Sequence, residues 1–421
     1  MSTGRRQMKL GAFLWATGHH IAAWRHPQAH VTAGIDIDHY IQLARTAEAA
    51  KFDMIFCEDA AGVREANVNI ASQTSRSIGF EPISLLAALA VQTERIGLVS
   101  TASTSYNEPY GLARTFLSLD HLSGGRAGWN LVTSASQIEA ANFGSTGLRP
   151  HADRYERARE FAAVVAALWR GAGTSGFNHE GRSFSVRDPL DLPRSPQGAP
   201  VMIQAGASDE GRDLAARTAD VVFTAAQTFK EAKAFYDDLK GRLAVYGREP
   251  DDVKIMPGVA PIVAASETEA RAKYDELQEL IPDDVGVALL SSYLSISDLA
   301  RYPIDGPLPE LPASEGMQSR QALVIEQSRR DNLSIRQLAR HFAGARGHWR
   351  VVGTPAQIAD ELEARFEGGA ADGFNVMPSY FPGEFDAFAT LVVPELQRRG
   401  LFRTDYRGST LREHLGLNRP A

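Results

Sequence analysis

The chain has 421 residues, of which 44% are hydrophobic and 23% are charged, and its formal net charge is −7. This composition can supply one large apolar core, and the lack of a Lys/Arg-rich run argues against nucleic acid or an anionic membrane as a partner. The single cysteine, Cys57, excludes an internal disulfide and a cysteine-rich metal site, and it fits a reducing compartment. The apolar stretch at residues 11–16 is too short for a signal sequence and no stretch reaches membrane-spanning length, so we expect a cytoplasmic protein.

Eight short apolar or β-branched runs alternate with longer amphipathic stretches. The candidate strands are residues 8–14, 53–58, 96–103, 126–133, 201–205, 221–225, 253–259 and 374–377. The stretches between them repeat their apolar residues with the 3.6-residue period of a helix, as at residues 36–50, 82–93, 111–122, 152–170, 209–219 and 229–246. Alternating strands and helices imply parallel strands, and eight such units predict an α/β fold of the (β/α)8, or TIM, barrel type. We expect a single domain over residues 1–421.

Two segments interrupt this alternation. Residues 171–200 are rich in Gly, Pro and Ser, and a larger segment, residues 282–347, precedes the last predicted strand. Long insertions in a compact domain are usually functional lids or oligomer contacts. We therefore expect the larger insertion to cover the mouth of the barrel.

Polar residues follow five consecutive predicted strands. The strands run into Thr-Gly-His-His at 17–20, Cys-Glu-Asp at 57–59, and hydroxyl- or amide-rich segments at 100–106, 129–134 and 204–208. In a parallel barrel the active site lies at the carboxyl ends of the strands. The pattern therefore predicts a polar ligand site at that end.

The segment from Gln204 to Gly211 is the best candidate for an anion site. Gly206 permits a tight turn, and Ser208 or Asp209 can cap the helix that follows. Backbone N–H groups at a helix start, with the Ser208 hydroxyl, suit a phosphate, although a plain helix cap would have the same sequence. His151 and Tyr155 share one face at the start of another helix and suit a phosphate too, although each could equally be a surface residue.

Two pairs of neighbouring polar residues allow other interpretations. His19 and His20 could be an acid/base pair, metal ligands or loop residues, and because neighbours point apart we expect at most one to face the cavity. Without a third ligand at suitable spacing we expect no metal site. Glu58 and Asp59 could suggest a glycosidase, but adjacent strand residues alternate sides and cannot flank one glycosidic bond.

Several of these segments together resemble the bacterial luciferase-like flavin monooxygenases. They are residues 18–27, 52–59, 105–110, 120–130 and 204–208, and the resemblance runs from about residue 8 to 401. It is closest to the branch of the nitrilotriacetate and dibenzothiophene sulfone monooxygenases. The resemblance implies a two-component system, in which a separate NAD(P)H-dependent flavin reductase supplies reduced FMN by diffusion, and it implies a homo-oligomer, dimer or tetramer.

The resemblance also implies roles for individual residues. Those matching flavin contacts of the family are Asp59, Thr101, Asn130 and Val132, and those matching its phosphate end are His151, Tyr155, Ala207 and Ser208. His20 matches a pocket position near the reacting end. Glu58 stands where the family often has a small residue, a departure that the sequence does not explain.

The function implied is oxygenation of a small organic substrate by a flavin hydroperoxide formed from reduced FMN and O2, in a pocket dry enough to protect it. His20 would donate a proton or hydrogen bond. Candidate pocket residues are Trp15, Phe56, Trp349 and Phe381, each of which could equally be a packing residue. A deazaflavin-dependent dehydrogenase of the same superfamily and a non-catalytic flavin-binding protein are the alternatives, and the sequence does not identify the substrate.

Overall fold

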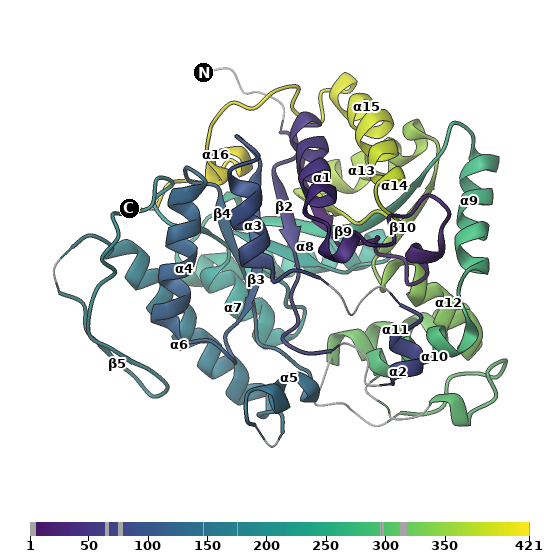
Figure 1. Ribbon diagram of the computed structural model, residues 1–421, viewed down its shortest axis with the longest axis horizontal. Helices are drawn as coiled ribbons and strands as arrows, with labels where there is room; N and C mark the ends of the chain where they lie inside the picture. Colours follow the sequence, from purple (N-terminus) through teal and green to yellow (C-terminus); the bar gives the residue numbers. More distant parts are fainter. Residues whose placement is uncertain are drawn as a thin grey trace.

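The computed structural model describes residues 6–63, 67–74, 79–145, 147–174, 176–294, 296, 299–311 and 318–420. Within these residues eight parallel strands form a closed ring, which confirms the predicted barrel (Figure 1). In order around the ring they are β1 (Lys9–Leu14), β2 (Met54–Cys57), β3 (Gly97–Ser103), β4 (Ala127–Val132), β7 (Val201–Gln204), β8 (Val221–Thr224), β9 (Lys254–Val263) and β11 (Gly373–Val376). Pairing of β9 with β8 on one side and β11 on the other, and of β11 with β1, closes the ring.

Alternate residues of each strand point to opposite sides of the barrel wall. Side chains such as Phe13, Phe56 and Ile203 form the barrel interior. Their neighbours, such as Leu14 and Ile55, pack against the surrounding helices. Burial on both faces explains why the strands appear in the sequence as nearly continuous apolar runs.

Long helices form the outer layer between consecutive strands. They are α1 (Ile37–Ala49), α3 (Pro82–Ala90), α4 (Pro109–Leu122), α6 (His151–Arg170), α7 (Asp209–Thr218), α8 (Phe229–Leu243), α9 (Glu267–Glu279) and α13 (Pro355–Glu367). Several begin at a side chain that accepts backbone N–H groups of the first turn, namely Asp36, Ser208, Thr228 and Thr354. After β11 the chain continues through α14 (Gly383–Ala387), a π-helical turn at Phe388–Val392 and α15 (Val393–Arg398). No helix among the described residues is both long and apolar enough to span a membrane.

A ninth parallel strand, β10 (Trp349–Gly353), was not predicted. It pairs with residues 259–263 of β9, beyond the part of β9 that pairs with β8. Val259 pairs with both Trp349 and Val376, so β10 and β11 lie on opposite edges of β9. Strand β9 is therefore longer than its predicted range, and its second half extends past the ring.

The two insertions have different structures. The first contains a short hairpin of β5 (His179–Glu180) and β6 (Ser185–Val186). The second is helical, with α10 (Asp283–Leu294), α11 (Gln318–Asp331) and α12 (Ile335–Ala345) around an apolar core of their own. Residues 175, 295, 297–298 and 312–317 of the insertions lie outside the described residues.

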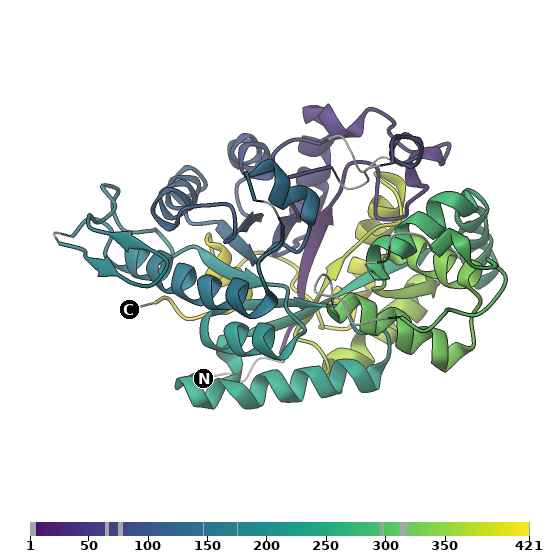
Figure 2. The ribbon, with the colours of Figure 1, turned by 90° about the horizontal axis from the view of Figure 1, so that it is seen from below.

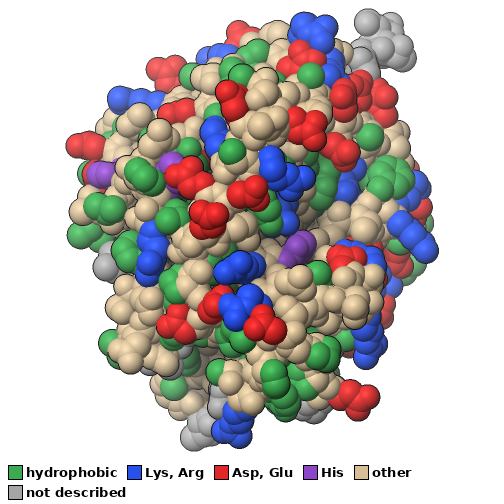
Figure 3. Space-filling model, turned by 90° about the vertical axis from the view of Figure 1, so that its right-hand side faces the viewer, with side chains coloured by type: hydrophobic (Ala, Val, Ile, Leu, Met, Phe, Trp, Pro, Cys, Tyr) green, Lys and Arg blue, Asp and Glu red, His purple; other side chains and the backbone are tan. Residues whose placement is uncertain are grey.

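The larger insertion lies beside one end of the barrel, together with the short helices α2 (Val68–Ala71) and α5 (Gln137–Asn142) (Figure 1). In Figure 2, which looks from that end, the insertion is the green group to one side of the strands. Figure 3 shows the face that carries α9, where acidic and basic side chains are interspersed.

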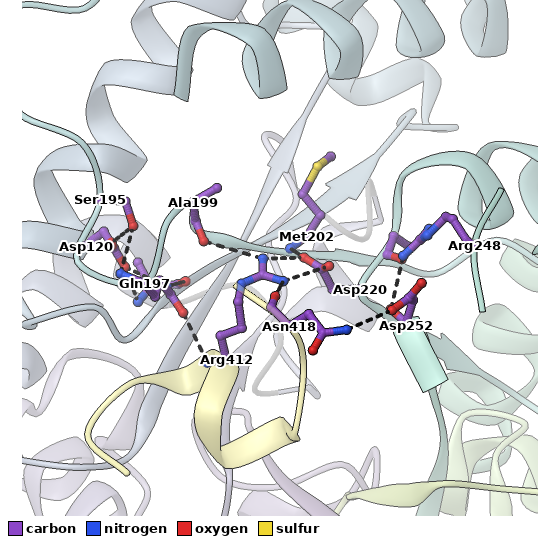
Figure 4. Close-up of polar contacts among 12 residues, drawn as sticks. Asp120, Ser195, Gln197, Ala199, Met202, Asp220, Arg248, Asp252, Arg412 and Asn418 are labelled. Carbon is purple, nitrogen blue, oxygen red and sulfur yellow. Dashed lines mark hydrogen bonds and ion pairs between the residues drawn. The ribbon is translucent and has the colours of Figure 1, made fainter. Parts of the chain in front are cut away.

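The opposite end is closed by α16 (Leu411–Leu415). Leu411, Leu415 and Leu417 belong to the interior cluster, and a Cβ at Gly97 would lie 2.4 Å from Leu411 Cδ1. Polar contacts fix this helix to the barrel floor, as Figure 4 shows: Arg412 Nη2 lies 2.8 Å from Asp220 Oδ2, and the Arg412 backbone N–H donates to Gln197 Oε1 at 3.1 Å. A plugged amino end leaves the carboxyl ends of the strands as the place for a site.

Candidate functional site

A chain of buried hydrogen bonds crosses the carboxyl ends of β2, β3 and β4. The Asn130 side-chain N–H donates to Thr101 Oγ1 at 2.8 Å, and the Thr101 hydroxyl donates to the Cys57 carbonyl at 3.0 Å. Asn130 is 3% exposed, and its Oδ1 has no hydrogen-bond partner among the described residues. A buried acceptor left without a donor is costly, so this oxygen is suited to an N–H group of a ligand.

The starts of α6 and α7 lie close together, although they are far apart in the sequence. His151 Nδ1 of α6 lies 4.0 Å from Glu210 Oε2 of α7, and the rings of His151 and Tyr155 are 4.7 Å apart. Ser208 caps α7 by accepting the Gly211 N–H at 3.1 Å. Two helix N-termini with an imidazole, a phenol and a hydroxyl form an arrangement that can bind a phosphate.

The loop between β7 and α7 passes unusually close to the helix start. A Cβ at Gly206 would lie 3.0 Å from the Gly211 Cα, so a larger residue would have to push the start of α7 away by a few tenths of an ångström. The loop thereby brings Ala207 and Ser208 to the first turn of α7. This is the geometry expected of a backbone cradle for an anion.

Two arginines of α6 add positive charge beside the starts of α6 and α7. Arg154 is buried and its Nη1 donates to the Ser134 carbonyl at 2.5 Å, while Arg157 Nε donates to the Thr104 carbonyl at 3.3 Å. On the opposing side, Asp209 is paired with Arg242 at 2.6 Å. These contacts tie the loops after β3 and β4 to α6.

Glu58 has a partner that the sequence did not suggest. Arg346, at the C-terminal end of α12, places its Nη2 2.8 Å from Glu58 Oε2 and its guanidinium carbon 4.2 Å from the centre of the Trp15 ring. Burial alone would lower the pKa of Arg346, but Glu58 and Tyr293 together outweigh this effect and raise the pKa above its ordinary value. The pair connects the insertion to the barrel mouth.

The two adjacent histidines point in different directions, as expected, and both are buried. His19 packs edge-on against Phe13 at 4.5 Å, and its Nε2 lies 2.8 Å from the Phe13 carbonyl, so it lies over the barrel interior. His20 lies 3.2 Å from the Gln278 amide of α9 and against Gly344 of α12. The structure thus brings His19 to the barrel mouth and directs His20, the predicted catalytic residue, toward the insertion.

The predicted pocket residues do not form one group. Trp15 lies at the mouth beside Arg346, and Phe56 lies deeper in the interior, with its ring 4.8 Å from that of Phe13. Trp349 instead packs outside the ring, under Arg365 at 3.7 Å, because β10 extends from β9 beyond the barrel. Phe381 likewise contacts Phe385 in the helix-facing layer.

The remaining predicted residues lie at the strand ends. The Val132 carbonyl accepts the Thr104 N–H at 2.9 Å, at the end of β4. Asp59 lines a cavity of about 260 Å³ between the ends of β1 and β2 and helices α1 and α3, together with Trp15 and Glu58. Within the described part of the chain there is no group of three or more His, Cys, Asp or Glu side chains placed to hold a metal ion.

Sequence reasoning missed the residues that follow α12. Arg346 faces the mouth, and the buried His348 stacks on Phe223 of β8 at 5.0 Å. Burial, and then the nearby Arg320 and Arg346, hold the His348 pKa well below its ordinary value, so this imidazole is neutral. The sequence Ala-Arg-Gly-His-Trp has only the signature of a helix end, and nothing in it shows that these side chains enter the barrel.

The chain is similar to known proteins along nearly its whole length. Residues 13–372 match the family described as luciferase-like monooxygenase. The chain is 49% identical to nitrilotriacetate monooxygenase component A of Aminobacter aminovorans, covering 99% of this chain and 97% of that protein, and 47% identical to N-acetyl-S-(2-succino)cysteine monooxygenase of Bacillus subtilis, covering 100% and 99%. Among solved structures, EDTA monooxygenase from Chelativorans superposes with a TM-score of 0.84 at 32% identity, covering 98% of this chain and 99% of that one.

Proposed function

Because this chain belongs to the luciferase-like monooxygenase family, we propose that it uses reduced FMN and O2 to oxygenate a small organic substrate. It is an oxidoreductase of the monooxygenase type, like its close relatives. One relative is named as a component A, and the pristinamycin IIA synthase to which the chain is also similar has subunits A and B. These names support a separate partner, which we propose to be an NAD(P)H-dependent flavin reductase.

The observation that carries this proposal is the fit of the mouth to a flavin phosphate. The phosphate would be held at the paired helix starts by Ser208, the Ala207 backbone, His151 and Tyr155. The ring system would lie along Asp59, Thr101, Asn130 and Val132, where Asn130 Oδ1 needs a donor. Reduced FMN, when bound, supplies the electrons that activate O2, while the protein supplies position and electrostatics.

The chain's own residues would keep the reacting region dry. Trp15 and Phe13 form an aromatic surface over the interior, and the Arg346–Glu58 pair holds the insertion against it. Excluding water strengthens every polar interaction inside the site and suppresses side reactions. We therefore propose that the insertion serves as the cover of the mouth.

We assign proton handling to His19 instead of His20. A carbonyl oxygen can only accept, so His19 Nε2 carries the hydrogen bonded to the Phe13 carbonyl, and Nδ1 is the atom that takes up or releases a proton. His20 is turned toward α9 and α12. The expected result is that His19→Gln lowers the rate of product formation more than His20→Gln, with both variants binding FMN.

The phosphate site can be tested with two matched cap variants. Ser208→Ala removes the cap of α7, and Ser266→Ala removes the equivalent cap of α9, far from the proposed site. Each loses about 1 kcal/mol of helix stability. We expect only Ser208→Ala to weaken FMN binding, by roughly tenfold, in a fluorescence titration. Equal FMN affinities for the two variants would contradict this location for the phosphate.

A further inference from the structure

The insertion brings two guanidinium groups to the barrel mouth. Arg320 of α11 donates through Nη1 to the Arg346 carbonyl, and the Arg320 guanidinium lies 5.4 Å from the ring of Tyr293 of α10. A Cβ at Gly347 would lie 2.6 Å from the same Arg320 nitrogen, so the two arginines and the turn after α12 are tightly packed. Three insertion helices thus converge on this point.

The charges here do not balance. Glu58 is the carboxylate that pairs with Arg346, and it acts on Arg320 as well. His348 is neutral and adds no charge, and the Arg320 pKa is lowered, first by burial and then by the positive charge of Arg346. Among the described residues, two guanidinium groups facing one carboxylate leave one positive charge uncompensated in a buried region, which is costly without an anionic partner.

Arg346 also has unused hydrogen-bond donors. Its Nη2 is paired with Glu58, and the Tyr293 side chain also lies near enough to the guanidinium to raise its pKa, whereas Nε and Nη1 are buried without an acceptor at full hydrogen-bond geometry in the described part of the structure. The guanidinium lies over Trp15 and Phe13, which belong to the first strand and to the loop after it, on the opposite side of β2 from the β4 and β7 ends. These donors are therefore separate from the phosphate end at α6 and α7.

The backbone at Arg346 adopts a conformation that arginine takes less readily than glycine. Its φ of +55° is left-handed, a conformation that favours glycine at the end of a helix, and the next residue is a glycine with φ of +76°. Arginine at such a position costs backbone strain that glycine would avoid. This strain fits a functional role for the guanidinium in its position beside Trp15 and Glu58.

We propose that Arg346 binds a carboxylate of the substrate, and that the substrate is an organic anion. The proposal rests on the oxygenase function above and names its substrate class. A carboxylate bound at Nε and Nη1 would satisfy both donors and compensate the excess charge of the Arg320, Arg346 and Glu58 group. Arg346 is then a specificity residue for the reaction.

The test is calorimetric titration of the FMN-loaded protein with two carboxylate probes, nitrilotriacetate and methylthiosuccinate, and with their uncharged amides. Arg346→Gln is expected to weaken binding of at least one carboxylate by roughly tenfold or more and to leave the amides unchanged. Glu58→Gln frees Arg346 and is expected to keep or tighten carboxylate binding. Arg365→Gln is the control, because Arg365 is also buried, stacked on a tryptophan and without an acceptor for its Nε among the described residues, but it lies outside the ring.

Three outcomes would overturn the proposal. The first is that neither carboxylate binds the wild type more tightly than its amide does. The second is that Arg346→Gln and Arg365→Gln have equal effects on carboxylate binding. The third is that Glu58→Gln weakens carboxylate binding as much as Arg346→Gln does, as expected if the ion pair is purely structural. FMN affinity is measured on the same samples. If the protein binds FMN but has equal affinities for the carboxylates and their amides, only this inference is contradicted. If it does not bind FMN, the proposed function itself is contradicted.

Discussion

At the scale of single residues, Asn130 is the side chain whose surroundings most clearly call for a ligand. One end of its amide is engaged with Thr101 and the other is buried without a partner among the described residues. Asn130→Leu keeps the side-chain volume but removes both the amide donor and the amide acceptor. We therefore expect the FMN dissociation constant to rise by roughly 10- to 100-fold, the equivalent of about 1–3 kcal/mol. A fluorescence titration with FMN measures this.

A matched control exists on α5. The Asn142 side-chain N–H donates to the Ala61 carbonyl at 2.9 Å, outside the proposed flavin site. Asn142→Leu should therefore leave FMN affinity unchanged. If both asparagine variants bound FMN as the wild type does, the ring system could not lie along β3 and β4 as proposed.

Sequence reasoning located the polar strand ends but could not orient every side chain. It expected at most one of His19 and His20 to face the cavity and chose His20, but the direction of each depends on how the loop after β1 meets α9 and α12, through contacts between residues far apart in the sequence. Trp349 was named as a candidate pocket residue that could equally be a packing residue, and β10 carries it outside the ring. The Glu58–Arg346 pair joins residues 288 positions apart, beyond any local pattern.

At the scale of elements, α16 acts as the floor of the barrel. Leu411 is fully buried against Gly97, where a Cβ would collide with it, and near Gly128, where a Cβ would make a tight contact. Leu411→Ala should lower the free energy of unfolding by about 2–5 kcal/mol through loss of burial and the cavity left behind, measured by urea denaturation. Leu391→Ala, at a half-exposed position, is the control and should change stability little.

The FMN affinity of the folded Leu411→Ala variant should be unchanged, since the mouth is at the other end of the barrel. A large loss of FMN affinity would show that the floor shapes the site.

The same helix gives the protein a specific pH dependence. Burial lowers the pKa of His414 to about 4, so it is neutral in the folded protein, while the unfolded chain takes up a proton near its ordinary pKa of about 6.5. The unfolded state binds more protons between these values, so stability falls as the pH drops from about 6.5 to 4, by about 3 kcal/mol from this group. His414→Leu should flatten the pH profile of the unfolding free energy over that window. An unchanged slope would mean that His414 is already protonated in the fold.

Elements were predicted well where they repeat a local pattern and poorly where they do not. The strand and helix of each barrel unit have their own periodicity, so α1, α6 and α7 begin and end within a residue or so of their expected ranges. Strand β10 has only five residues with an arginine among them, and its partner is the far half of β9. The helices of the larger insertion form a separate core whose position beside the mouth depends on contacts such as Arg346 with Glu58.

At the scale of the whole molecule, the barrel is closed at one end by α16 and flanked at the other by an insertion that carries charged residues to the mouth (Figures 1 and 2). The eight-strand barrel followed from the alternation of the sequence alone, and the family resemblance was confirmed along nearly the whole chain. The proposed cofactor and the proposed site share one physical requirement, a flavin held at the strand ends away from water.

The most direct test loads the protein anaerobically with reduced FMN, admits ¹⁸O₂ with a panel of candidate carboxylate substrates, and follows both flavin reoxidation and the mass of the product. The account predicts that bound reduced FMN is reoxidised with different kinetics from free FMN, and that one ¹⁸O atom appears in a product. Binding of a deazaflavin in place of FMN, or FMN reoxidation at the free rate with no labelled product from any substrate, would contradict it.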